Sequence, residues 1–427
     1  MRIREIEIMA FSRRHFLGSA GRLGLAAAVI AIPGDAVDAS RPDTPFVGNR
    51  VGFYGAHQAG IATPPQRFLL YGAFDLRSSD RAELQRVLQD WTSASISLTQ
   101  GHPVGPVEPR NPLIAPVDPG EAVGRGPARL TLTFGLGRSL FVDVQNRDRL
   151  GLADRLPPPL ISLPRLTLNE DLDEHRSLGD IGVQCCADDA QVIFHALHAL
   201  ARIGRPFVRL RWCQLGFAAT SATGRAQETP RNLQGFKDGT NNIDTSDTAA
   251  MQQNVWVGTR DDPEWMRGGS YVVTRRIRIF LEAWDQTALS DQEATIGRHK
   301  VSGAPLGGRL EHDIARLDAR SGDGIPVIPI NAHIRVAAPA DNDGVEILRR
   351  GYSFTDGVDA TTGGLDAGLF FVAYQRDPRT QYVPLQKQLA EKDALNEYVQ
   401  HVASGVFAVL PGVAPGAYLG EKLFSAG

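Results

Sequence analysis

Cysteine and net charge are both scarce in this chain of 427 residues. Its three cysteines are Cys185, Cys186 and Cys213, and an odd number with two adjacent members provides no disulfide framework. The 45 basic and 48 acidic side chains leave a formal net charge of -3, so no long-range positive field gathers phosphate backbones. The sequence therefore excludes a disulfide-stapled fold and argues against nucleic acid as a partner.

The chain does contain enough apolar material for a large core. Hydrophobic residues make up 42% of it, which excludes disorder as a whole. The length predicts two or three domain-sized units. No Gly-rich phosphate loop follows the first expected strand, so the sequence disfavours a dinucleotide-binding fold.

The N-terminus resembles a twin-arginine signal peptide. Residues 12–17 read SRRHFL, a weakly apolar stretch follows at 24–30, and small residues offer a cleavage site after Ala39. A membrane anchor is the alternative, but Arg22 interrupts the apolar run and Pro33 ends it short of the ~20 residues that a spanning helix needs. We therefore expect this segment to direct export, through the twin-arginine machinery, to a periplasmic or extracellular location.

Strand and helix patterns alternate along the rest of the chain. The first strand is expected over 68–76, where turn residues bound an apolar run. A helix follows from a capping box at Asp80, and a second helix opens at Asp188 and stops at Gly204. Apolar residues at helical spacing give each helix a packing face: Leu84, Val87, Leu88 and Trp91 in the first, and Val192, Ile193, Ala196, Leu197, Leu200 and Ile203 in the second.

Two histidines, His195 and His198, lie on the second predicted helix. At 100° per residue both point away from the apolar stripe, so the pattern favours surface histidines over a metal-binding pair. Further strands are expected over 130–135, 207–212, 271–281 and 369–374, and a helix carrying Leu385, Leu389, Leu395, Tyr398 and Val399 comes last.

Strands followed by capped helices in each half favour an α+β fold. We expect two ferredoxin-like domains, with antiparallel sheets flanked by helices. The expected bounds are 1–39 for the signal peptide, 40–230 for the N-terminal domain and 231–427 for the C-terminal domain.

The sharpest local signal is the string GFKDGTNN at 235–242. Gly235 and Gly239 hold Asp238 in a tight turn, where the backbone can approach a flat ligand closely. By itself, an ordinary Asp-Gly turn would explain the string, because such dipeptides punctuate many loops. Two later strings argue against this simple explanation, namely NAHIR at 331–335 and ILRRGYSF at 347–354.

In this order the three strings resemble the dye-decolourising peroxidase family. The strings FYGAHQAGI at 53–61 and QCCADD at 184–189 support the resemblance, which covers residues 46 to 415. The chain is most similar to the exported subgroup associated with bacterial iron uptake. This resemblance implies a haem-dependent peroxidase that reduces hydrogen peroxide through a ferryl intermediate, oxidises dyes, phenols or porphyrin-type donors, and releases iron from haem as a further activity.

The resemblance also implies one non-covalent haem b per chain, bound in the second half, with His333 as the proximal iron ligand. No CxxCH string is present for covalent attachment. A ligating imidazole normally donates its outward N–H to a carboxylate or carbonyl, and Asp366 is the candidate partner. Arg335 is expected on the same side of an extended segment as His333, where it would pair with a haem propionate. A solvated strand arginine is the alternative for Arg335, and a satisfied core or loop histidine would be the default for His333 alone.

On the other face of the haem, the resemblance implies general acid/base work by Asp238 on bound peroxide. Arg349 would stabilise the negative charge that builds as the O–O bond breaks, because its guanidinium stays protonated. Its neighbour Arg350 is expected to face a propionate or solvent. Hydrogen peroxide and a small-molecule or dye-like electron donor are the expected partners, whereas a homodimer and an association with an iron permease stay open.

Three alternatives compete with this interpretation. A non-peroxidatic haem carrier or iron-releasing protein would use the same pocket, but it has no need of an acid/base carboxylate beside a charge-stabilising arginine. A structural or assembly protein would bind no haem at all. The related chlorite-decomposing haem proteins share a similar sandwich but lack the GxxDG turn that is present at 235–239.

Overall fold

The structure is a computed structural model that describes residues 49–166, 170–224, 227–261 and 263–425. The predicted signal peptide at 1–39 lies outside the described residues. Within the described ranges, no helix is both long enough and apolar enough to cross a bilayer.

The first half of the chain forms four antiparallel strands and two long helices. The neighbour order in the sheet is β4-β1-β3-β2, with a helix after β1 and another after β3, which is the ferredoxin-like arrangement. The elements are β1 (Phe68–Leu76), α1 (Arg81–Thr99), β2 (Thr131–Gly137), β3 (Ile181–Ala187), α2 (Ala190–Gly204) and β4 (Val208–Ala219).

The second half repeats this strand order. Its neighbours run β9-β5-β8-β7, again all antiparallel, with a helix between the third and fourth strands. The elements are β5 (Ser270–Ile279), β7 (Tyr352–Val358), β8 (Leu365–Gln375), α7 (Tyr382–Lys392) and β9 (Val399–Val409). The prediction of an α+β fold with two ferredoxin-like units is confirmed.

Shorter elements connect these strands and helices. They are α3 (Thr248–Asn254), α4 (Leu281–Asp285), α5 (Leu289–Ile296), α6 (His333–Val336), β6 (Leu348–Arg349) and α8 (Glu421–Phe424). Single 3-10 turns occur at η1 (Arg138–Leu140), η2 (Ala153–Arg155), η3 (Glu174–Arg176), η4 (Glu264–Met266), η5 (Pro339–Asp341) and η6 (Ala394–Glu397).

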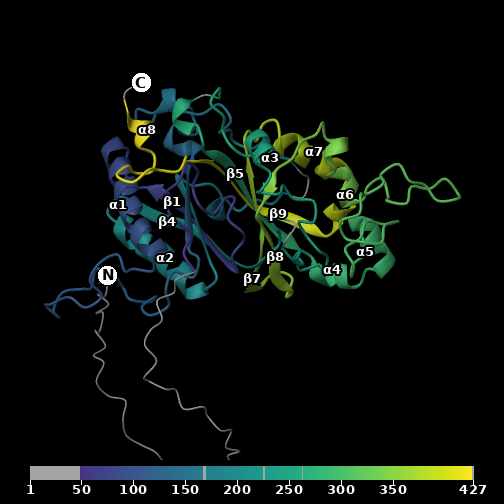
Figure 1. Ribbon diagram of the computed structural model, residues 1–427, viewed down its shortest axis with the longest axis horizontal. Helices are drawn as coiled ribbons and strands as arrows, with labels where there is room; N and C mark the ends of the chain where they lie inside the picture. The colour runs from purple at the N-terminus through teal and green to yellow at the C-terminus, as the bar shows by residue number, and fades with distance from the viewer. Residues whose placement is uncertain (1–48, 167–169, 225–226, 262, 426–427) are drawn as a thin grey trace, which may run out of the picture. The chain divides into compact units, whose positions relative to one another are not determined.

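Two strand pairs join the halves into a closed ring. β2 pairs with β9, where Gly135 is opposite Val409, and β4 pairs with β7, where Phe217 is opposite Ser353. Because β5 also pairs with β8, eight of the described strands close on themselves, and β6 adds to the side of β8. In Figure 1, α1 and α2 lie with β1 and β4, whereas α5, α6 and α7 lie beyond β8 and β9. Closure satisfies the strand edges that an open sheet would leave unpaired.

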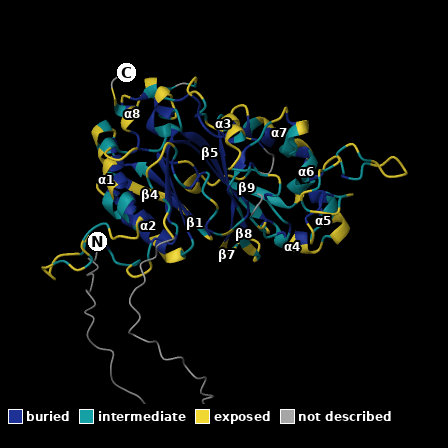
Figure 2. Cartoon of the chain, viewed as in Figure 1, coloured by how far each residue is buried: buried dark blue, intermediate teal, exposed yellow. Residues whose placement is uncertain are grey.

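Side chains on the two faces of the sheet pack into different cores. Along β1, Leu70 and Phe74 join the core that α1 and α2 cover, while Tyr71 and Ala73 join a second core shared with Trp212 and strands of the other half. This alternation follows from the two-residue period of a strand. Burial on both faces is why the strands are dark along most of their length in Figure 2.

Most predicted elements lie where the sequence indicated, with corrections at helix ends. The N-cap of α2 is Asp189 instead of Asp188, whose carboxylate contacts Arg129. The last predicted helix is too long, because α7 ends at Lys392 and Val399 begins β9. β9 pairs with strands on both sides, so tertiary pairing overrides the local helical pattern.

The prediction that His195 lies on the surface is wrong, because only 4% of this residue is exposed. The loop over 101–127 folds back across α2, and Glu121 contacts both histidines: its carboxylate oxygens lie 2.7 Å from His195 Nδ1 and 2.6 Å from His198 Nδ1. In the part of the chain that the structure describes, no cluster of three or more His, Cys, Asp or Glu side chains could hold a metal ion.

A buried carboxylate links three segments of the first half. Asp180 is 2% exposed and accepts from the backbone N–H of Leu76 at 2.8 Å. Its two oxygens also lie 2.7 and 2.8 Å from one guanidinium nitrogen of Arg149. This ion pair holds the 138–150 segment against β1 and β3.

We expect Asp180→Ala to lower the free energy of unfolding by about 3 kcal/mol, because Arg149 and the Leu76 N–H would lose a buried acceptor. Urea unfolding followed by circular dichroism measures the change. The exposed Asp90 on α1 gives a matched control, Asp90→Ala, which should stay within about 0.5 kcal/mol of the wild type. Equal unfolding midpoints for the two variants would contradict the structural role of Asp180.

Candidate active site

One cavity of about 540 Å³ lies in the second half of the chain. Strands β5, β8 and β9 form one wall, while α6, α7 and the GFKDGTNN loop contribute the others. Its apolar lining consists mainly of Ile277, Ile279, Leu369, Phe371, Leu385 and Leu389. A mostly apolar cavity with a few convergent polar groups is typical of a small-molecule or cofactor site.

His333 enters this cavity from the first residue of α6. Its Nδ1 lies 2.6 Å from Oδ2 of Asp393, and the other carboxylate oxygen accepts from the backbone N–H of Leu395 at 2.9 Å. Because Asp393 is only 4% exposed and accepts at both oxygens, it holds the proton of the imidazole on Nδ1. Nε2 has no partner among the described residues, so its lone pair is available as a ligand.

The contact with Asp393 also affects the pKa of the imidazole. Burial by itself would lower the pKa of His333, but the neighbouring Asp393 carboxylate outweighs it and raises the pKa above the ordinary value of 6.5. Asp238 adds to the increase and Arg349 opposes it, so both side chains lie close enough to act on the imidazole through the cavity.

Asp238 and Arg349 form an ion pair on the same cavity. A guanidinium nitrogen of Arg349 donates to Oδ1 of Asp238 at 2.9 Å, and both side chains are mostly buried. Asp238 needs the glycine that follows it, because Gly239 adopts a φ of +88° and a Cβ there would lie 2.7 Å from Cα of Ser221. The tight turn expected from the sequence is therefore real, and it carries the carboxylate into the cavity.

Two asparagines fix this pair. The side chain of Asn242 accepts from the backbone N–H of Arg349 and donates to its carbonyl, both at 2.9 Å. Asn232 donates to the other oxygen of Asp238 at 3.4 Å. Asn242 thus ties the GFKDGTNN loop to β6, although the two are 107 residues apart in the sequence.

The cavity residues fit a haem held by one axial ligand. A bare metal ion would need several protein ligands, whereas haem iron needs only an imidazole such as that of His333. The apolar walls suit a porphyrin, and buried polar atoms on cavity residues lack partners in the described part of the chain, namely Nε2 of Gln234 and Nδ1 of His401. Buried polar groups without protein partners are expected where a ligand binds.

Three residue predictions need correction. Asp366 is not the partner of His333, because its carboxylate lies 2.8 Å from the guanidinium of Arg276 on β5. Arg335 is outside the cavity lining and donates to the backbone carbonyls of Leu317 and Ile328. The segment is helical, and residues two apart on a helix point in nearly opposite directions.

The prediction that Arg350 faces a propionate or solvent is also wrong. It is 1% exposed and donates to the carbonyl of Thr63 and to Oε1 of Gln66, inside the ring of strands. It faces neither solvent nor the cavity, because consecutive residues of extended chain point to opposite sides.

The sequence reasoning missed Asp393, Asn242 and His401. Asn242 was within the string that carried the resemblance, but its contacts run to a distant strand. Asp393 lies 60 residues from His333, in a segment that reads as the end of a helix. The structure brings His333, Asp238 and Arg349 to one cavity, and their chemical roles stay a prediction.

The comparisons with known proteins agree with this geometry. Residues 58–218 match the family described as Dyp-type peroxidase, N-terminal, and residues 229–414 match Dyp-type peroxidase, C-terminal. A deferrochelatase of Escherichia coli strain K12 is 40% identical over 366 residues, which are 84% of each chain.

Solved structures are also similar to this chain. DtpA from Streptomyces lividans is 40% identical with a TM-score of 0.79, over 88% of this chain and 98% of that one. A DyP-type peroxidase from Cellulomonas bogoriensis is 37% identical with a TM-score of 0.78, over 88% of this chain and 98% of that one. With both halves matched in order, the chain belongs to the Dyp-type peroxidase family and is a haem-dependent peroxidase whose haem is not covalently attached.

Proposed function

We propose that the chain reduces hydrogen peroxide and oxidises dye-like, phenolic or porphyrin-type donors at the cavity lined by His333, Asp238 and Arg349. One observation carries this proposal: an imidazole with a free Nε2 shares a cavity with a carboxylate–guanidinium pair. Bound haem would supply the iron that binds peroxide and takes up its oxidising power.

His333 would hold the iron through Nε2 while donating from Nδ1 to Asp393. A carboxylate partner makes an imidazole a stronger donor ligand and fixes the ring orientation. The second oxygen of Asp393 is held by the Leu395 N–H, so the ring cannot rotate without breaking a buried contact. This arrangement favours a firmly held, electron-rich ligand.

Asp238 would act as the acid/base group. It would accept the proton from the peroxide oxygen that the iron would hold, and it would return this proton to the other oxygen, which leaves as water. Arg349 would stabilise the negative charge that develops in this step, from a position fixed by Asn242. A haem carrier needs neither group, so their pairing favours a peroxidase over that alternative.

A second activity in the same cavity is release of iron from haem. The observation that favours it is the similarity to curated relatives called deferrochelatases, at 40% identity over most of both chains. Appearance of metal-free porphyrin fluorescence after incubation with haem, and its absence with a His333→Ala variant, would distinguish this activity from peroxidase turnover.

We further propose two domains, 40–230 and 231–427, with the haem cavity in the second. The family matches at 58–218 and 229–414 support a division near residue 230. Export through the twin-arginine pathway to the periplasm or the extracellular space is proposed from residues 12–17 and the apolar stretch after them. Association with a second copy or with an iron permease belongs to the same proposal for iron uptake.

The decisive experiment is replacement of His333. We expect His333→Ala to lose the Soret absorbance of bound haem, because the described cavity offers no other imidazole paired with a carboxylate at Nδ1. Asp393→Asn should retain haem but bind it about 10-fold to 100-fold more weakly, as loss of such a partner typically does. The control is His102→Ala, at an exposed loop residue. Unaltered haem absorbance in His333→Ala would contradict the assignment.

We expect Asp238→Asn to slow the reaction with peroxide by about 10²-fold to 10⁴-fold, because the amide cannot accept the peroxide proton. Arg349→Leu should slow it by about 10²-fold through loss of the fixed cation. Stopped-flow absorbance of haem-loaded protein mixed with peroxide measures both rates. Asp90→Asn, on the exposed face of α1, is the matched control and should react like the wild type.

Haem binding should weaken in acid. A protonated His333 cannot bind iron, and Asp393 raises the pKa of His333 above 6.5. The affinity for haem should therefore begin to fall at a pH above 6.5. Below the pKa of His333, it should fall about tenfold for each pH unit. Haem titrations of the haem-free protein between pH 5 and 8.5 measure this affinity, and the midpoint is the pH at which the affinity has fallen to half of its plateau value. In Asp393→Asn the midpoint should move to lower pH, and an unchanged midpoint would contradict the role of the carboxylate.

A further inference from the structure

Residues 311–317 form part of the rim of the haem cavity, and we call this stretch the strap. Five of its residues line the cavity, namely His312, Asp313, Ile314, Ala315 and Leu317. The strap belongs to no helix or strand, and Ile314 within it is 88% exposed. It is therefore a layer one chain thick, with the cavity on one side and solvent on the other.

The first end of the strap is held at the GFKDGTNN loop. The carboxylate of Glu311 forms an ion pair with Lys237 and accepts from Oγ1 of Thr240 at 3.1 Å. Its backbone carbonyl accepts from the buried Arg298 at 3.0 Å. Burial by itself would raise the pKa of Glu311, but the hydrogen bonds from Lys237 and nearby threonines outweigh it and lower the pKa. The carboxylate is therefore charged at neutral pH, and its ion pair lies mostly out of solvent.

The other end of the strap is held at α6. Arg335 donates to the backbone carbonyls of Leu317 and Ile328, which joins the two sides of the green loop beside α6 at the right of Figure 1. The strap thus runs from the loop that carries Asp238 to the helix that carries His333. A chain that joins these two sides passes along the edge of a haem held between them.

The middle of the strap has only local contacts. Within the part of the chain that the structure describes, the hydrogen bonds and ion pairs of residues 312–316 reach no further than positions 309–319. A segment that is fixed at two points and has few contacts between them opens at a lower free energy than a helix or a strand. Release of one end is therefore enough to uncover this edge of the cavity.

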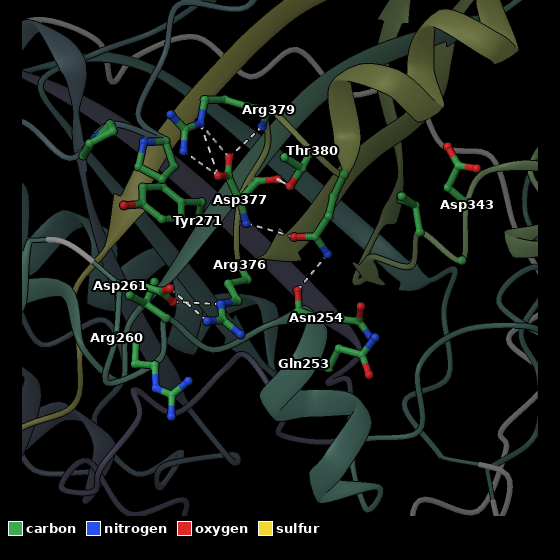
Figure 3. A pocket seen from close by; sticks show the side chains of 16 residues that line it. Gln253, Asn254, Arg260, Asp261, Tyr271, Asp343, Arg376, Asp377, Arg379 and Thr380 are labelled. Carbon is green, nitrogen blue, oxygen red and sulfur yellow. Dashed lines mark hydrogen bonds and ion pairs between the residues drawn. The ribbon is translucent and has the colours of Figure 1, made fainter.

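A different wall of the cavity is firmly tied. Val345 lines both the haem cavity and a second cavity of about 590 Å³. Next to it, the backbone carbonyl of Glu346 accepts from the buried Gln381 at 2.7 Å. Two ion pairs stiffen the lining of the second cavity (Figure 3), namely Arg376 with Asp261 and Arg379 with Asp377. The wall at Val345 is thus held along its length, unlike the strap.

We propose that haem enters the cavity and porphyrin leaves it past the strap, with Glu311 as the latch. When Glu311 detaches from Lys237 and Thr240, the strap swings about its end at α6, and the flat ring slides through the uncovered edge in its own plane. The inference rests on the proposed function, because an enzyme that removes iron from haem must admit and discharge a whole porphyrin.

The latch has a kinetic signature that a direct haem contact lacks. Glu311, Lys237 and Thr240 hold one another, so their contacts stabilise the closed cavity whatever it contains. Loss of the latch therefore raises the rates of haem uptake and haem loss together, and the affinity, which is their ratio, changes little. Removal of a group that binds haem directly would speed haem loss alone and weaken the affinity.

The test measures both rates without peroxide. Haem loss is followed as transfer from haem-loaded protein to excess apomyoglobin, and haem uptake by stopped-flow absorbance of the haem-free protein. Lys237→Met and Glu311→Gln should each raise both rates by about 10-fold to 100-fold, the range expected for loss of a hydrogen bond to a charged group. Lys237→Arg keeps the positive charge and should exchange haem at nearly the wild-type rate.

The matched control is Lys422→Met, the same change at an exposed residue of α8. Equal transfer rates in Lys237→Met and this control overturn the inference. Faster loss without faster uptake also overturns it, because that result makes Lys237 a direct haem contact. The double variant Lys237→Met/Glu311→Gln should be no faster than Glu311→Gln alone, since both changes break the same ion pair, and additive effects contradict the latch.

Failure of this inference is distinguishable from failure of the proposed function. An Asp238→Asn variant that reacts with peroxide like the wild type contradicts the peroxidase proposal. The transfer rates of the Lys237 and Glu311 variants decide the role of the strap in either case, because no peroxide enters that measurement.

Discussion

The 2.6 Å hydrogen bond between His333 and Asp393 is the contact on which the site depends. It joins the first residue of α6 to the turn after α7, two segments that share no strand pairing. By holding the proton on Nδ1, Asp393 leaves Nε2 free toward the cavity, and its charge makes the imidazole a better donor. Without that carboxylate, His333 would be an ordinary partly exposed histidine.

The closed ring of strands provides the rigid side of the cavity. Arg349 and Arg350 are adjacent on the chain but serve different spaces, because extended backbone sends one guanidinium to Asp238 and the other into the interior of the ring. The buried Arg350 donates to Thr63 and Gln66, so it ties the residue after β6 to the N-terminal half. The position of Arg349 thus depends on both halves of the chain.

The haem cavity combines apolar walls with His333 and the Asp238–Arg349 ion pair, which suits a porphyrin and a small oxidant.

The sequence by itself determined the local elements and the reactive residue types. Strand β1, the packing face of α1 and the turn around Asp238 follow from periodicity, capping and glycine positions, which are properties of neighbouring residues. Only the tertiary structure decided the partners: Asp393 instead of Asp366 beside His333, and the burial of Arg350. Such contacts join residues tens to hundreds of positions apart, and no local pattern encodes which distant side chain a closed sheet brings into reach.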